Sequence, residues 1–141
     1  MDISFERENL LSVIENIDNR IEDFKVLIFR LVSYELDYSP QSIKYVELVG
    51  KTLIDKIKNN TEIQKDMALY LGETIQRNYN GIWDICESSN ERINGQPYVK
   101  NISIGNKTFF PFLSLLSFIK TPKIGCFLRE IEEIDYLNST N

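Results

Sequence analysis

One carboxylate in the sequence has unusual neighbours for a charged group. Glu73 follows Gly72 inside an otherwise apolar helical stretch. In such surroundings it could be partly buried and could accept hydrogen bonds from backbone amides of the next turn or from Tyr70 or Tyr98. It could instead lie on the helix surface and pair with Arg77, four positions later. We expect a structural role before a contact with a ligand or partner, and catalysis last.

The sequence contains no histidine, which removes several kinds of chemistry. Ser-His-Asp and Cys-His catalysis and histidine-ligated zinc are excluded. The two cysteines, Cys86 and Cys126, are expected to be free thiols, because the chain begins without a signal-peptide pattern and a reducing cytoplasm is the default. Neither a phosphate-binding loop nor a dinucleotide fingerprint is present. We therefore predict a non-enzymatic cytoplasmic protein with no metal and no cofactor.

Two further pairs of residues could contact a ligand or partner. Asp37 and Tyr38 lie in the turn Asp-Tyr-Ser-Pro, where an aspartate more often caps the next helix. Trp83 is expected to anchor the core, and Asp84 should point to the opposite face of the same strand.

The charge of the chain is acidic, with 16 basic and 21 acidic residues and a net charge of −5. An acidic surface disfavours binding to nucleic acid and suits a soluble protein or one with a basic partner. Near the C-terminus Glu130 and Glu133 belong to an acidic run that also includes Glu132 and Asp135, most simply a solvated helix face. No apolar run approaches the roughly 20 residues that cross a membrane, so no membrane contact is expected.

The elements that must position these residues begin with a long helix over about residues 4–35. Its apolar positions alternate in steps of four and three from Leu10 to Leu31, which forms a heptad-like seam. A break near Asp18-Asn19 is possible, because both residues are weak helix formers. The seam should pack on the rest of the domain. The alternative is a homodimer through the same seam.

The rest of the chain predicts a mixed fold. Two helices should follow, one opening at Ser39-Pro40 and one at Thr61 with Gln64 as a capping box, and the second should stop at Asn80-Gly81. Two strands around Trp83 and Tyr98 should pair as an antiparallel hairpin, with a short third strand after Gly105-Asn106. Helices from Pro111 and over about 125–137 should close the chain. Residues 1–141 thus form one α+β domain, with two or three antiparallel strands and two C-terminal helices.

The motifs of residues 36–118 are similar to those of a group of small uncharacterised bacterial proteins. The pattern consists of a Tyr-Ser-Pro-x-Ser helix start from Tyr38 to Ser42, a Tyr-Leu-Gly-Glu helix end from Tyr70 to Glu73, and Gly81-x-Trp83. In size and acidity such proteins resemble the immunity proteins encoded beside secreted toxins. The resemblance implies a fold and carries over no catalytic residue.

Together these features favour a protein-binding module, most concretely an immunity protein that masks the site of a cognate toxin, such as a basic toxin domain. Glu73, Asp84 and the C-terminal acidic run would then contact the toxin. A second hypothesis is a small-molecule or regulatory module with a pocket lined by Tyr70, Glu73, Trp83 and Tyr98. A structural homo-oligomer through the Leu10–Leu31 seam is the third.

Overall fold

A computed structural model describes residues 7–102, 107–127, 129, 130 and 133 of the chain. Its helices are α1 (Arg7–Glu15), α2 (Ile17–Arg20), α3 (Glu22–Val32), α4 (Ile43–Thr52), α5 (Ile54–Lys58), α6 (Thr61–Tyr79) and α7 (Pro111–Lys120), with a 3-10 turn η1 (Pro40–Ser42) before α4. Its strands are β1 (Ile82–Ile85), β2 (Pro97–Ile102) and β3 (Lys107–Phe109). The fold is α+β, as the sequence predicts.

The N-terminal helical stretch is divided into three consecutive helices. The divisions fall at Asn16 and Ile21, whose φ angles of −114° and −107° depart from helical geometry, on either side of the predicted break at Asp18-Asn19. The predicted start near residue 4 lies outside the described residues. Leu10, Ile17, Ile21, Phe24 and Ile28 of the seam are at most 3% exposed. These five side chains therefore pack inside the domain and are not available to a second copy, whereas Leu31 at the end of the seam is 49% exposed.

The next helical stretch also differs from a single helix, because it is divided at Leu53 between α4 and α5. Its start agrees with the prediction. Ser39 Oγ accepts a hydrogen bond from the Ser42 amide at 3.2 Å, and Pro40 occupies the first turn. Gly50 allows close packing on α7, since a Cβ there would lie 2.9 Å from the ring of Phe118.

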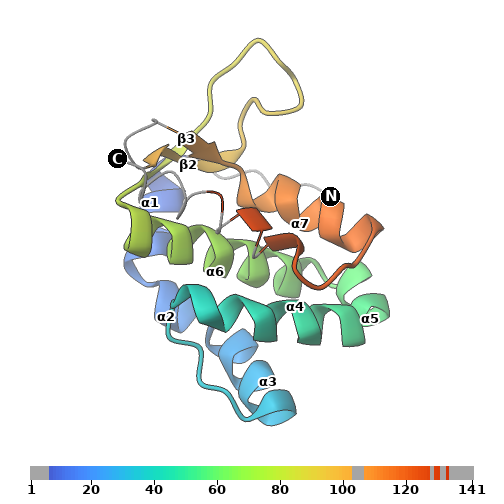
Figure 1. Cartoon of the computed structure of the whole chain (residues 1–141). Coiled ribbons are helices and arrows are strands. Elements are labelled where there is room, and N and C mark those ends of the chain that lie inside the picture. The colour runs from blue at the N-terminus through green and yellow to red at the C-terminus, as the bar shows by residue number, and fades with distance from the viewer. Residues whose placement is uncertain (1–6, 103–106, 128, 131–132, 134–141) are drawn as a thin grey trace.

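Helix α6 lies at the centre of the molecule, between the sheet and α7 on one side and α4 on the other (Figure 1). Asn60, and not the predicted Thr61, caps its start, because Asn60 Oδ1 accepts from the Ile63 amide at 3.1 Å. Gln64 is buried and donates to the Ile57 carbonyl at 2.7 Å instead of completing a capping box. The helix ends where predicted, at Asn80, which adopts a left-handed φ of 61°.

The three strands form an antiparallel sheet in the order β1-β2-β3. Trp83 pairs with Val99, and Asp84 pairs with Tyr98 across the first two strands. A long loop joins these strands and projects away from the helices (Figure 1). The predicted turn at Gly105-Asn106 lies outside the described residues.

The C-terminal segment is fastened to α4 by a buried carboxylate. Glu47 Oε2 accepts hydrogen bonds from the amides of Gly125 and Phe127, at 2.6 and 3.2 Å. The described residues after Gly125 are helical, and the remainder of the helix predicted over 125–137 lies outside the described part. Among the residues that the structure describes, no helix is both long and apolar enough to cross a membrane.

Candidate functional site

The structure distributes the predicted contact residues over four places. These are the interior between α6 and β1, the segment before η1, the sheet, and the C-terminal segment. They hold, in that order, Tyr70, Glu73 and Trp83; Asp37 and Tyr38; Asp84 and Tyr98; and Glu130 and Glu133. The first and third places adjoin through consecutive residues of β1, and Tyr38 joins the first two.

Glu73, Trp83, Arg77 and Gly72 form what we term the Glu73 junction. Glu73 is 5% exposed. Its Oε1 accepts from the indole Nε1 of Trp83 at 3.0 Å, and its Oε2 accepts from Arg77 Nε at 2.9 Å. Glu73 is therefore buried, and the ion pair with Arg77 that the sequence offers as one alternative is present. Its second donor is the indole of Trp83, and not a tyrosine or a turn amide.

Trp83 fills the space beside Glu73. The residue is 6% exposed, so it is the core anchor that the sequence predicts. A Cβ at Gly72 would lie 2.1 Å from Cη2 of the Trp83 ring, and only glycine permits this approach. Tyr70 is fully buried, and Tyr98 stacks on Phe110 with ring centroids 5.2 Å apart. The indole ring therefore occupies the place where the sequence suggested a pocket.

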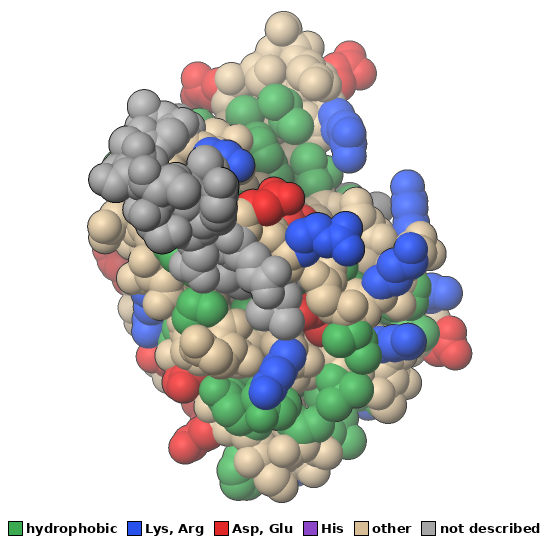
Figure 2. Space-filling view, viewed as in Figure 1, with side chains coloured by type: hydrophobic (Ala, Val, Ile, Leu, Met, Phe, Trp, Pro, Cys, Tyr) green, Lys and Arg blue, Asp and Glu red, His purple; other side chains and the backbone are tan. Residues whose placement is uncertain are grey.

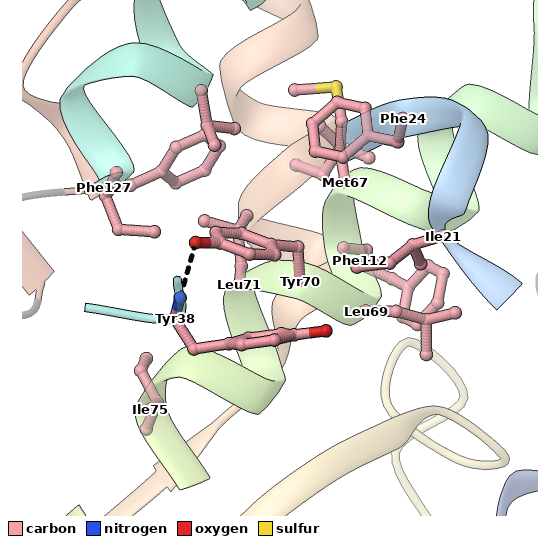
Figure 3. Close-up of a cluster of buried hydrophobic side chains, with 14 of the residues drawn as sticks. Ile21, Phe24, Tyr38, Met67, Leu69, Tyr70, Leu71, Ile75, Phe112 and Phe127 are labelled. Carbon is pink, nitrogen blue, oxygen red and sulfur yellow. Dashed lines mark hydrogen bonds between the residues drawn. The ribbon is translucent and has the colours of Figure 1, made fainter. Parts of the chain in front are cut away.

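Tyr38 is held in a strained conformation by contacts from several elements. Its φ is 61°, which a residue with a bulky side chain rarely adopts. Its amide donates to Tyr70 Oη at 2.9 Å, and its carbonyl accepts from Asn78 Nδ2 at 2.8 Å. Its ring stacks on that of Tyr70 at 4.9 Å (Figure 3) and lies under the Arg77 guanidinium at 3.8 Å. Such strain persists only where the surroundings fix the residue, and it is common at functional sites.

The hydroxyl of Tyr70 takes part in two hydrogen bonds, one as acceptor and one as donor. Ser42 Oγ donates to the Ser39 carbonyl at 2.6 Å, so the 2.6 Å contact between Tyr70 Oη and Ser42 Oγ has Tyr70 as its donor. Tyr70 thus accepts from the Tyr38 amide and donates to Ser42. Burial raises the pKa of Tyr70, which keeps the phenol neutral. Its role is to fix the start of η1 and the segment before it.

Residues 33–39 return along α3 and form the wall of a groove. Ser33 ends α3 with a left-handed φ of 54° and reverses the chain. Glu35, Leu36 and Asp37 of this segment line one hollow together with residues of α2 and α3. At the far end Tyr38 Oη donates to Asp18 Oδ1 at 2.5 Å, which ties the returning segment to α2.

This hollow, which we term the α3 groove, has a volume of about 750 Å³. Its lining combines four carboxylates, three apolar side chains and two cations. They are Asp18, Glu22, Glu35 and Asp37; Val26, Phe29 and Leu36; and Lys25 and Arg30. Val26 and Arg30 also line a smaller hollow of about 450 Å³, so α3 forms a ridge between two depressions.

Two apolar residues of α3 outside the seam are open to solvent, since Phe29 is 53% exposed and Val26 39%. Leu31, the last residue of the seam, is 49% exposed. Figure 2 shows hydrophobic side chains gathered over the part of the surface where Figure 1 places α3 and α4, and Leu48 of α4 is also exposed. Adjacent exposed apolar side chains with a charged rim are typical of a surface that contacts another molecule.

Two carboxylates of the α3 groove are held in their charged forms. Hydrogen bonds from Lys25 and then Tyr38 lower the pKa of Asp18. A hydrogen bond from the Ser39 hydroxyl at 2.6 Å lowers the pKa of Asp37. Burial and the bond to Asp18 raise the pKa of Tyr38, whose hydroxyl stays a donor. The sequence favours Asp37 as the cap of the next helix, but the cap is Ser39; Asp37 holds Ser39 in place through its amide and hydroxyl and also lines the groove.

The other predicted residues have local partners. Asp84 Oδ2 accepts from Lys100 Nζ at 2.8 Å on the neighbouring strand. Glu130 accepts from Ser114 Oγ at 3.1 Å, and burial raises its pKa. Glu133 is exposed. Glu132 and Asp135 of the same acidic run lie outside the described residues.

Sequence reasoning did not identify most of the groove. The omitted residues are Asp18, Glu22, Lys25, Val26, Phe29, Arg30, Glu35 and Leu36. One signal was present, because Val26 and Phe29 are an apolar pair three residues apart on the face of the helix away from the seam. The buried Glu47 was also omitted, although it interrupts an apolar face in the same way as Glu73.

Within the described residues, no group of three or more His, Cys, Asp or Glu side chains could hold a metal ion. Cys86 and Cys126 are free cysteines, as expected. What the α3 groove offers chemically is a set of acceptors for cationic groups beside an apolar surface. Comparison of the chain with known protein families, with curated proteins and with solved structures gave no match.

Proposed function

We propose that this protein is a non-enzymatic binding protein, that its partner is another protein, and that the α3 groove is the contact surface. The observation that carries the proposal is the half-exposed ring of Phe29 beside Val26 in a hollow with a carboxylate rim. Large apolar side chains at the centre of a contact and charges at its edge are the usual arrangement of protein interfaces.

The most concrete form of this proposal is immunity, in which the protein neutralises a toxin by covering its site. Toxins that act on nucleic acid need basic sites, and carboxylates can lie where the substrate phosphates would lie. The net charge of −5 supports attraction to a basic partner. The contact residues differ from those first suggested, because Glu73 is buried and Asp84 is paired with Lys100.

Capture from cells of the native host tests the proposal. Tagged wild-type protein, Phe29→Ser and Leu11→Ser serve as baits, and mass spectrometry quantifies the proteins that copurify. Leu11 is the matched control, because it is 50% exposed on α1 and lies outside the groove. We expect one stoichiometric partner with the wild type and with Leu11→Ser, and about tenfold less with Phe29→Ser. Equal recovery with all three baits, or none above the tag alone, would contradict the proposal.

Growth measurements test the immunity form. The captured partner, expressed alone, should arrest growth, and co-expression with the wild type or Leu11→Ser should restore it. Co-expression with Phe29→Ser should not. A partner that is harmless when expressed alone would exclude immunity and leave the binding function in place.

A further inference from the structure

The side chains of the α3 groove indicate the chemical class of what it binds. We propose that the groove receives a basic amphipathic segment of the partner protein, in which Lys or Arg side chains flank a large apolar residue. This inference deepens the proposed function and rests on it. Four features of the groove carry it.

The first feature is the placement of the carboxylates in two rows. Asp18 and Glu22 are four positions apart across the junction of α2 and α3. Glu35 and Asp37 lie on the returning segment and are both exposed, with the buried Leu36 between them. Both walls of the groove therefore carry carboxylates, and a segment lying in the groove meets negative charge on either side.

The second feature is that this negative charge is only partly neutralised inside the protein. Lys25 Nζ is bound to Asp18 Oδ1 at 2.8 Å and lies 5.0 Å from the Tyr38 ring centroid. Both hydrogen bonds to Asp18 reach Oδ1, and its side chain remains 63% exposed. Glu22 and Glu35 are exposed, and neither forms an ion pair with another residue of the described part. Cationic side chains of a partner can reach these groups.

The third feature is an apolar surface within the same groove. Leu36, 6% exposed, closes the groove, while Phe29 and Val26 face solvent. A large apolar side chain of the partner would cover these surfaces, and its burial would exclude water from the surrounding ion pairs. Purely polar cationic chains would leave this surface uncovered. An acidic segment or a nucleic acid would place negative charge against both rows.

The fourth feature is that the wall is fixed before anything binds. Tyr38 anchors the returning segment to α6 through the hydroxyl of Tyr70 and to α2 through Asp18. Asp37 is held by the Ser39 amide at 3.0 Å. A preformed groove loses little conformational entropy on binding, so a short segment can bind measurably by itself.

Fluorescent peptides test the inference with the full-length protein. Peptides of about 12 residues would cover the length of α3. The first carries Lys and Arg around a central pair of Phe, the second replaces both Phe with Ser, and the third replaces the cations with Glu. By fluorescence anisotropy the first should bind about tenfold or more tightly than either of the others. Its affinity should fall as salt rises from about 50 to 300 mM. Equal affinity of the basic and acidic peptides would overturn the inference.

Variants locate the binding. Phe29→Ser and the double change Glu22→Lys with Glu35→Lys should each weaken the first peptide about tenfold or more. Leu11→Ser and Glu91→Lys are the matched controls, at an exposed leucine of α1 and an exposed glutamate of the hairpin loop, and should bind like the wild type. Circular dichroism confirms that each variant folds. Unchanged peptide affinity in both groove variants would overturn the inference.

Capture from the host separates this inference from the proposed function. A native partner that still binds Phe29→Ser and the double charge variant would leave a binding protein whose contact lies elsewhere, and the groove inference would fail. Absence of any captured partner, together with the expected peptide results, would establish the chemistry of the groove and contradict the proposed function.

Discussion

The Glu73 junction and the α3 groove contain the same kinds of side chain in opposite surroundings. Each combines carboxylate, aromatic and cationic groups. In the junction both oxygens of Glu73 have donors, and the Trp83 ring is buried. In the groove Glu22 and Glu35 face solvent, and Phe29 is half exposed. Buried polar groups need partners within the fold and hold it together, while exposed ones remain available to a second molecule.

The largest effect should come from the aromatic ring of the junction. Trp83→Ala removes a buried ring that packs on Gly72 and donates to Glu73, so the free energy of unfolding should fall by about 3–5 kcal/mol. Urea denaturation followed by circular dichroism measures it, since the only tryptophan is lost. Trp83→Phe keeps most of the volume and should cost less. A loss below about 1 kcal/mol for Trp83→Ala would mean that the junction does not hold the fold together.

The carboxylate of the junction should have the next largest effect. Glu73→Ala leaves the buried indole N–H without its acceptor and should cost about 1–3 kcal/mol in the free energy of unfolding. Glu73→Gln keeps an acceptor oxygen for the indole but places an NH2 group, which cannot accept, against Arg77 Nε. Because the side chain of Arg77 is 42% exposed and can turn to solvent, this variant should cost below about 1 kcal/mol. Equal losses from the two variants would show that the contact with Arg77, and not the hydrogen bond from Trp83, is what matters.

A smaller change in the free energy of unfolding, and one that depends on pH, is expected for Asp18. This residue of the α3 groove binds Tyr38, whose ring contacts Arg77 of the Glu73 junction. The Asp18 carboxyl has a pKa below its ordinary 3.8 in the folded protein. The unfolded chain therefore binds its proton more readily, and the stability that ionised Asp18 contributes is present above about pH 4 and lost as the pH falls through the lowered pKa. The difference in unfolding free energy between wild type and Asp18→Asn should stay constant from neutral pH to pH 5 and shrink below pH 4.

Lys25 provides the control for this pH dependence, because its hydrogen bond is the largest cause of the lowered pKa. In a Lys25→Met background, the difference in unfolding free energy between the protein with Asp18 and its Asp18→Asn variant should decrease less as the pH falls below about 4. A difference that grows on acidification would contradict the assigned direction of the pKa shift.

The smallest effect on stability should come from the residue with the largest expected effect on binding. Phe29→Ser changes a side chain that is 53% exposed, so the free energy of unfolding should stay within about 0.5 kcal/mol of the wild type. Urea denaturation measures it, beside the peptide titration. A large loss of stability would move Phe29 into the same category as Trp83 and remove the contrast between the two regions.

The sequence predicts the local features of this fold well. Three features could be predicted because each depends on residues only a few positions apart. They are the apolar seam from Leu10, the turn residue Asn80 and the proline at position 40. The divisions at Asn16, Ile21 and Leu53 were harder to place, because none is marked by glycine or proline. There packing of the apolar faces against α6 and the sheet outweighs the preference for one continuous helix.

The candidate site could be predicted only in part. The apolar neighbours of Glu73 left burial and a surface pair with Arg77 both open, and the turn indicated a role for Asp37 and Tyr38. The groove depends on the chain reversing at Ser33 and on Tyr38 reaching Asp18, 20 residues earlier. Contacts at such separation leave no periodic trace in the sequence. The exposed pair Val26 and Phe29 was the one local sign of it.

The amide of Tyr38 makes the groove wall open to kinetic measurement. This N–H donates to the hydroxyl of Tyr70 on α6, and not to a carbonyl of its own helix or strand. Exchange of that single hydrogen with deuterated solvent therefore reports separation of the returning segment from α6, independently of helix fraying. A bound segment that needs the wall in place should slow the exchange in proportion to its occupancy. The exchange rate of one backbone amide can thus report how often the groove wall opens.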